Sequence, residues 1–243
     1  MDFHLPKVPH SWRELAREIG IIVLGVLIAL FFEQLVQRWD WMAKVRAADK
    51  AMRAELLQDD GPQIYMDAAI HPCVVARLDA IRSAVEAGRP RPDVAKLISD
   101  FWTPLLTYDS SAHAAAESSQ VTFYFDPKQL YPFTQVYESI PLMNQTGVIQ
   151  ARDAAGLKAF RRTGEPLSAA EGDRVLTKVE QLRNDDRMMW YAAQFTLPLI
   201  REIGPLDPAY TQVSLHMARR HYGTCVKDLP PNFPAGVPSS DLD

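Results

Sequence analysis

Histidine, cysteine and carboxylate side chains carry most protein chemistry, and this chain holds few of them at productive spacing. His71 and Cys73 flank Pro72, so an imidazole base and a thiol nucleophile lie two residues apart. His113 and Glu117 are four residues apart, on one face of a helix, and would form half of a metal site. Neither pair has a third group nearby in the sequence. We therefore expect a surface hydrogen bond or ion pair between His113 and Glu117, and no catalytic residue, metal site or cofactor.

Motifs with known mechanisms do not change this expectation. The sequence lacks G-x-x-x-x-G-K, G-x-G-x-x-G, G-x-S-x-G, H-E-x-x-H and C-x-x-C. The net charge of −4 argues against a strongly basic nucleic-acid binder, so no nucleic acid is expected as a partner. The chain is 47% hydrophobic, which excludes a disordered protein.

The two cysteines, Cys73 and Cys225, are candidates for a disulfide. Cys73 should lie at a helix start after Pro72, and Cys225 follows the last expected helix. A bond between them would tether the chain end to the body of the domain. The alternative is two separate buried thiols, since free cysteine often behaves as a small core hydrophobe.

A cluster of aromatic residues is the one candidate for a pocket lining. Its members are close in sequence: Tyr124, Tyr131, Phe133 and Tyr137. Core packing is the alternative that we favour for them.

A run of 14 uncharged residues, 19–32, indicates a membrane anchor. As a helix it covers about 21 Å, and apolar flanking residues lengthen it. Trp12 and Trp39 stand about 40 Å apart along a helix, which matches a bilayer with its headgroup regions. No A-x-A-like cleavage site follows Ala29, so the segment should remain in the mature protein as a signal anchor.

The orientation of the anchor receives two opposing indications. Three basic residues precede the run and five follow it within about 20 residues, which favours a cytoplasmic C-terminal domain. The even number of cysteines favours an oxidising compartment. Because the charge margin is narrow, we expect a periplasmic domain.

Helix signals cover the rest of the chain. A capping box at Ser11 begins a helix that should continue as a stem and end in a turn at residues 59–62. Further helices should begin near Cys73 and Pro92, and another should cover Ser110–Gln120. Capping residues predict three more helix starts: Asp126-Pro127, with interruptions or kinks at Pro132 and Pro141; Ser168 with Glu171; and Asp207-Pro208.

Two other runs allow alternatives. Residues 121–125 (VTFYF) are the only strand-like run, too short and isolated to form a sheet. Residues 188–200 are uncharged, but Gln194 and Pro198 and the flanking arginines favour a core helix over a second span.

The anchor resembles that of an uncharacterised group of single-pass inner-membrane proteins, known mainly from proteobacteria. The residues that carry the resemblance are the E-x-x-I-I-V-x-G-V-L-x-A-L pattern within 11–30, followed by Glu33 and Gln34, and more loosely residues 53–60 and 72–79. This resemblance covers about a third of the chain. It implies a single-pass topology in a bacterial inner membrane and implies no activity.

The expected fold class is all-α, with an N-terminal transmembrane helix that continues into a long stem helix, followed by a compact, bundle-like helical domain. The expected divisions are a tail (1–10), the transmembrane helix and stem (11–60), the helical domain (61–227) and a Pro-rich disordered tail (228–243). The expected function is binding or scaffolding at the lipid bilayer, with homo- or hetero-oligomers through the stem or transmembrane helix. The alternatives are an accessory subunit of a larger membrane complex and a small helical enzyme with dispersed site residues.

Overall fold

The computed structural model describes residues 12–161, 167–230 and 233. Within these residues the chain is all-α, without a strand, as the sequence predicts. The chain divides into two compact units, residues 1–47 and 48–243. Ser11, where a capping box was predicted, and most of the predicted disordered tail lie outside the described residues.

The first unit is the greater part of helix α1 (Trp12–Ala54). Every large apolar side chain from Ile19 to Phe32 is exposed, on all sides of the helix. At the end of this run, the Gln37 amide donates a hydrogen bond to the Glu33 carboxylate at 3.4 Å, which satisfies a polar group one turn from the apolar surface. The helix is long and apolar enough to cross a membrane.

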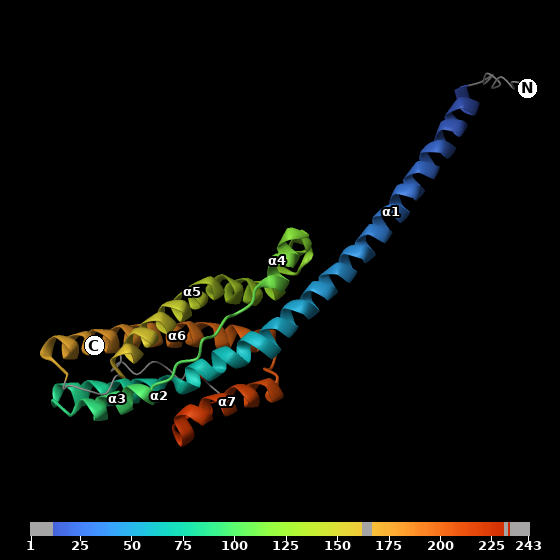
Figure 1. Ribbon diagram of the computed structural model, residues 1–243. Coiled ribbons are helices and arrows are strands. Elements are labelled where there is room, and N and C mark those ends of the chain that lie inside the picture. The colour runs from blue at the N-terminus through green and yellow to red at the C-terminus, as the bar shows by residue number, and fades with distance from the viewer. Residues whose placement is uncertain (1–11, 162–166, 231–232, 234–243) are drawn as a thin grey trace, which may run out of the picture. The chain divides into compact units, whose positions relative to one another are not determined.

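The predicted turn at residues 59–62 is wrong, because helix continues through it. A π-helical turn, η1 (Glu55–Asp60), joins α1 to α2 (Gly61–Glu86) without a break (Figure 1). The Gly61 N–H donates to the Leu56 carbonyl five residues back, so the hydrogen-bond pattern changes where Pro62, which has no N–H, follows. Pro72 also lies inside α2, so Cys73 is in mid-helix and not at a helix start.

The other helix starts agree with their capping residues. The Asp126 carboxylate caps α5 (Pro127–Lys158), and Asp207 caps α7 (Pro208–Tyr222). Ser168 and Glu171 form the predicted capping box of α6 (Ala169–Ile203). Two shorter helices, α3 (Arg91–Ser99) and α4 (Ser111–Ser118), lie near their expected places. Helix α5 is not interrupted at Pro132 or Pro141, because buried residues around both prolines hold it in the core.

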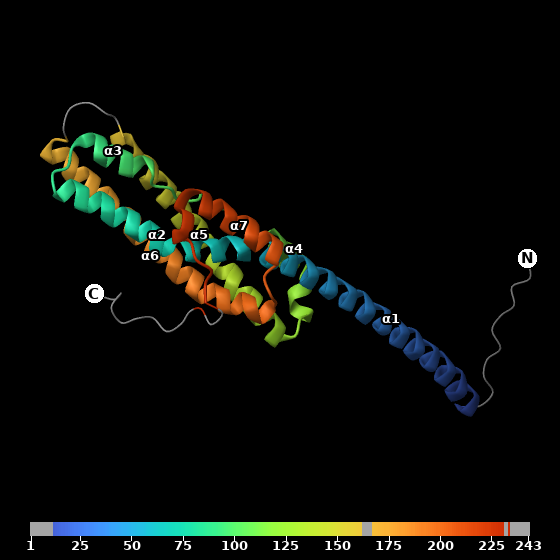
Figure 2. The same ribbon diagram turned by 90° about the horizontal axis from the view of Figure 1, so that it is seen from below.

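The second unit is a bundle around α6. Helix α6 packs against α5 and α2, and α2 packs in turn against α7 (Figures 1 and 2). The side chains that this packing buries completely include large residues from five segments: Met52, Leu56, Ile64, Phe101, Phe133 and Ile140. The core face of α6 includes Met189, Ala193 and Leu197, so the uncharged run at 188–200 is part of a core helix.

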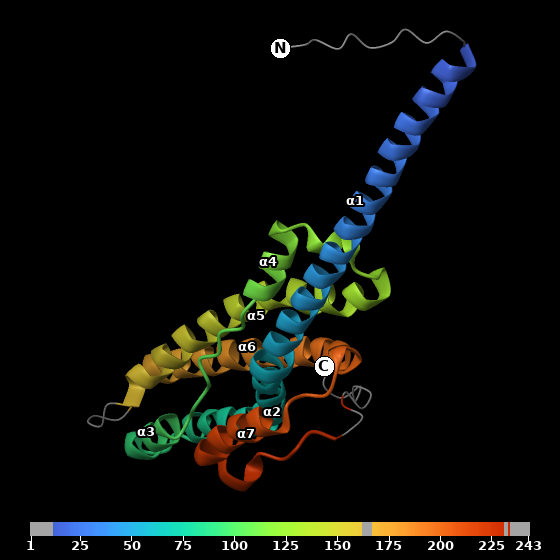
Figure 3. The ribbon, with the colours of Figure 1, turned by 90° about the vertical axis from the view of Figure 1, so that its right-hand side faces the viewer.

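An extended segment, residues 101–110, leads from α3 to α4 (Figure 3). Burial alternates along it, with Leu106 and Tyr108 inside and Leu105 and Thr107 outside. The side-chain amide of Asn144 pairs with the Tyr108 backbone through two hydrogen bonds of 2.8 and 2.9 Å, so it acts as a strand partner would. The run predicted as strand-like, residues 121–125, is instead a 3-10 helix, η2 (Val121–Tyr124).

Gly61 is the position where the π turn should tolerate no side chain. A Cβ there would lie 2.4 Å from the Leu56 carbonyl oxygen and 2.4 Å from Leu206 Cδ2. We expect Gly61→Ala to lower the free energy of unfolding by about 1–3 kcal/mol, the usual cost of overpacking, measured by thermal unfolding of the detergent-solubilised protein. Gly147→Ala in α5 is the matched control, because its Cβ would meet only the Leu106 carbonyl oxygen, at an ordinary contact distance of 3.6 Å. Equal stability of the two variants would contradict this account of the turn.

Candidate functional site

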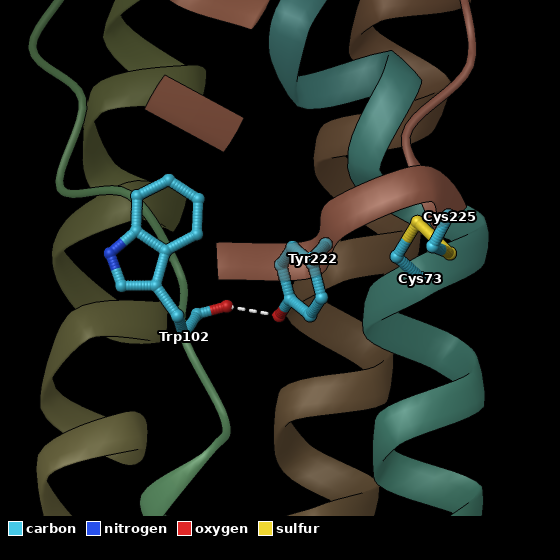
Figure 4. Close-up of a disulfide and its surroundings, with 4 residues drawn as sticks. All are labelled: Cys73, Trp102, Tyr222 and Cys225. Atoms are coloured by element: carbon cyan, nitrogen blue, oxygen red, sulfur yellow. Dashed lines mark hydrogen bonds between the residues drawn. A yellow bond between two sulfur atoms is a disulfide. The ribbon is translucent and has the colours of Figure 1, made fainter. Parts of the chain in front are cut away.

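A disulfide joins Cys73 in α2 to Cys225, in the short 3-10 turn η4 (Gly223–Cys225) after α7 (Figure 4). The two Cα atoms are 5.9 Å apart. Beside the bond, the Tyr222 hydroxyl donates to the Trp102 carbonyl in the extended segment (Figure 4). The C-terminal end of α7 is therefore fixed to both α2 and the extended segment.

The chain after Cys225 runs back along α2 and α6, and two further contacts hold it. The Tyr65 hydroxyl accepts a hydrogen bond from the Leu229 N–H at 2.8 Å. The Arg201 guanidinium donates to the Phe233 carbonyl. This C-terminal segment (226–230 and 233) is thus attached at its start by the disulfide and further on by both helices.

The C-terminal segment forms one wall of a cavity of about 500 Å³, which we call the α2–α6 cavity. Its other walls come from α2 and α6. The lining is mostly apolar and includes Pro72, Val75, Trp190, Leu229 and Phe233. Volume and lining both fall in the range of small-molecule pockets.

His71 is a polar residue of the cavity lining, and Asp186 and Trp190 hold its ring in place. Its Nδ1 lies 2.6 Å from Oδ2 of the buried Asp186, and its ring stacks on Trp190 with centroids 4.8 Å apart. The side chain of His71 is 19% exposed, and that of Asp186 is 5% exposed. Burial raises the pKa of Asp186, and the contact with His71 opposes this rise. A buried carboxylate beneath an imidazole fixes the orientation and tautomer of the ring.

Buried carboxyl groups gather near the π turn. A carboxyl group is buried at each end of η1. Glu55, at the start, accepts hydrogen bonds from the Ser111 hydroxyl (2.9 Å) and the Ala112 N–H (3.0 Å). Asp60, at the end, accepts one from the Asp109 N–H (3.1 Å). The second carboxylate oxygen of each group has no hydrogen-bond partner among the described residues. Burial, with a smaller contribution from Glu55, raises the pKa of Asp60 to about 7.

Asp67 lies farther along α2 in an apolar stretch. Burial raises its pKa to about 8, and the nearby charge of Asp186 adds to the rise. Tyr108 is also buried, and its hydroxyl lacks a partner within the described part of the chain. The interior of the second unit therefore favours protonated Asp60 and Asp67 near neutral pH.

The four aromatic residues considered as a pocket lining do not share one environment. Phe133 and Tyr137 are in the core, where the Tyr137 ring stacks on His113 at 4.6 Å between centroids. Tyr124 and Tyr131 are 52% and 58% exposed. Core packing, which we favoured for all four, holds for Phe133 and Tyr137 and is wrong for Tyr124 and Tyr131.

The two pairs weighed for chemistry have different outcomes. His113 and Glu117 do lie side by side on α4, with Nδ1 and Oε2 3.7 Å apart. Cys73 has no thiol to act as a nucleophile beside His71, because it is bonded to Cys225. In the described ranges, no three His, Cys, Asp or Glu side chains are grouped so that they could hold a metal ion.

The sequence interpretation missed the partners of His71. Asp186 and Trp190 lie one helical turn apart on α6, more than 100 residues away from His71, so only tertiary packing brings them together. One signal was available for the buried acids. Asp60 and Asp67 are seven residues apart, and Asp67 interrupts the apolar run 64–70, so both follow the core face of a helix.

Comparisons with known proteins supply no relative: no family model, no curated protein and no solved structure matches this chain.

The disulfide should account for a large share of the stability of the second unit. The bond closes a sequence separation of 152 residues, for which the chain-entropy model gives about 5 kcal/mol. We expect the free energy of unfolding of the Cys73→Ala/Cys225→Ala variant to be about 2–5 kcal/mol lower than that of the wild type. The measurement is thermal unfolding with and without a reductant. Reductant should lower the midpoint of the wild type alone, and an insensitive wild type would refute the bond.

The buried carboxyl groups predict that stability falls as the pH rises. Asp60 and Asp67 keep their protons in the folded chain at pH values where an unfolded aspartate, of pKa near 3.8, has lost them. The folded state then binds more protons, so its stability falls from about pH 4 toward pH 8. Between pH 5.5 and 8.5 these two pKa values correspond to a loss of about 5 kcal/mol in the free energy of unfolding, with a lower unfolding midpoint.

Asp67→Asn is the control for this pH dependence, because asparagine has nearly the same shape and does not titrate. The variant should be more stable than the wild type at pH 8.5 and should depend less on pH. A wild-type midpoint that is constant or rises between pH 5.5 and 8.5 would contradict the assignment.

Proposed function

We propose that this protein is a single-pass membrane protein of the bacterial inner membrane that displays a helical binding domain in the periplasm. The observation that carries the proposal is the apolar surface of α1. No residue of its most apolar stretch is buried by the protein, so that surface needs lipid around it. The resemblance of residues 11–34 to anchors of inner-membrane proteins supports the choice of membrane.

The disulfide supports the periplasmic side. Disulfides persist in the bacterial periplasm and are rare in the reducing cytoplasm. Cys73 is buried and its Cα lies 5.9 Å from that of Cys225, so the folded domain brings the two residues within bonding range. The five basic residues after the span oppose this orientation, but long domains cross membranes largely regardless of such charges.

The α2–α6 cavity supports binding as the role of the domain. It combines an apolar lining with an oriented imidazole, and one wall is attached covalently. The disulfide removes the thiol that a His71–Cys73 dyad would need, so the residues considered for catalysis favour binding over an enzyme.

We expect the full-length protein to remain in the membrane fraction after carbonate washing, because its anchor spans the bilayer. Deletion of residues 1–34 should release a soluble, folded helical protein, as circular dichroism would show. Extraction of the full-length chain by carbonate would refute the anchor. A pair of reporters fused after Asp243, one active only in the periplasm and one only in the cytoplasm, tests the orientation separately.

A further inference from the structure

The α2–α6 cavity carries an inference that rests on the proposed binding role and specifies its ligand. We propose that this cavity binds a neutral, mostly apolar small molecule that donates one hydrogen bond, from a hydroxyl or amide group, to Nε2 of His71.

The size and lining of the cavity set the body of the ligand. About 500 Å³ accommodates a small organic molecule, and the walls offer the faces of Trp190 and Phe233 and the aliphatic surface of Val75 and Leu229. Burying apolar surface against such walls is favourable at roughly 25 cal/mol per Å². The ligand should therefore be apolar over most of its surface.

Charge around the cavity favours a neutral ligand. Asp79, the charged residue of the lining, already pairs with Arg183 at the cavity's edge. The Asp186 carboxylate already pairs with the His71 ring. A charged ligand would lose its hydration without gaining an unpaired opposite charge, and this loss is costly in an apolar site.

The imidazole of His71 sets the polar contact. When the Asp186 carboxylate accepts from Nδ1–H, the neutral form of the ring carries its lone pair on Nε2. Among the described residues none bonds to Nε2, while stacking on Trp190 fixes the plane of the ring. A ligand O–H or N–H would donate a hydrogen bond to this lone pair on Nε2. A hydrogen bond of this kind contributes about 1 kcal/mol.

The test uses a matched pair of probes, 1-naphthol and naphthalene, which differ by one hydroxyl group. Full-length protein with isotope-labelled histidine, in lipid nanodiscs, is titrated with each probe while the imidazole signals are followed by NMR. Comparison with the His71→Gln variant assigns the His71 signal, and empty nanodiscs measure partition of each probe into lipid. We expect 1-naphthol to shift the His71 signal and to bind about fivefold more tightly than naphthalene.

Two substitutions to tryptophan test the location. Val75 lines the cavity and is partly exposed, so Val75→Trp should fill it and abolish binding of both probes. Val213 is 70% exposed on α7, and Val213→Trp should leave binding unchanged. If Val75→Trp does not fold, the comparison of probes on the wild-type chain still decides.

Three results would overturn the proposal: no shift of the His71 signal, equal affinity for the two probes, or unchanged binding in a folded Val75→Trp variant. None of these would affect membrane anchoring, which the carbonate extraction tests independently. Conversely, probe binding by a protein that carbonate extracts would leave the cavity assignment intact and refute the anchor.

Discussion

The exposed apolar surface of residues 19–32 is the physical constraint on which the proposed account of this protein depends. The large apolar side chains there are exposed on every side of α1, and the second unit has its own complete core. Placing this surface in a bilayer removes it from water, and the helix satisfies all of its own backbone hydrogen bonds there. In the proposed account, an anchor that crosses the membrane commits the second unit to one side, and that side determines whether Cys73 and Cys225 can remain oxidised.

The disulfide in turn connects the proposed compartment to the α2–α6 cavity. Cys225 is the last residue of η4, and from it the chain returns over α2 and α6 to supply Leu229 and Phe233 to the α2–α6 cavity. Without the bond, this wall would depend on hydrogen bonds to Tyr65 and Arg201. A covalent tether at its start would reduce the freedom that the segment loses if a ligand binds as proposed. The proposal therefore links oxidation to binding through the C-terminal segment.

Much of the fold could be predicted from the sequence, because helix starts depend on local chemistry. Asp126, Ser168 and Asp207 each satisfy backbone N–H groups within three residues, so their effect does not depend on distant packing. The turn expected at Gly61-Pro62 failed for the opposite reason. The space for a Cβ at Gly61 is taken by the Leu56 carbonyl oxygen and by Leu206, which packs there from 145 residues away.

The candidate site could be predicted only in part. The sequence offered Cys73 and Cys225 as a pair, but it gave no information on Asp186 and Trp190 beside His71, because the three residues come from two helices. The buried Asp67 depends likewise on packing of α2 against α6. Solvent-exposed residues such as Tyr131 were grouped with the buried Phe133 because the sequence spacing of aromatic residues does not distinguish core from surface.

The central claim is that the domain lies in an oxidising compartment with Cys73 and Cys225 bonded, and thiol trapping in cells tests it most directly. Cells that express the full-length protein are quenched in acid, and the denatured protein is treated with a polyethylene-glycol maleimide before and after reduction. The account predicts no gain in mass before reduction and a gain of two labels after it. Two labels without reduction would show free thiols in the cell and would contradict both the bond and the periplasmic location.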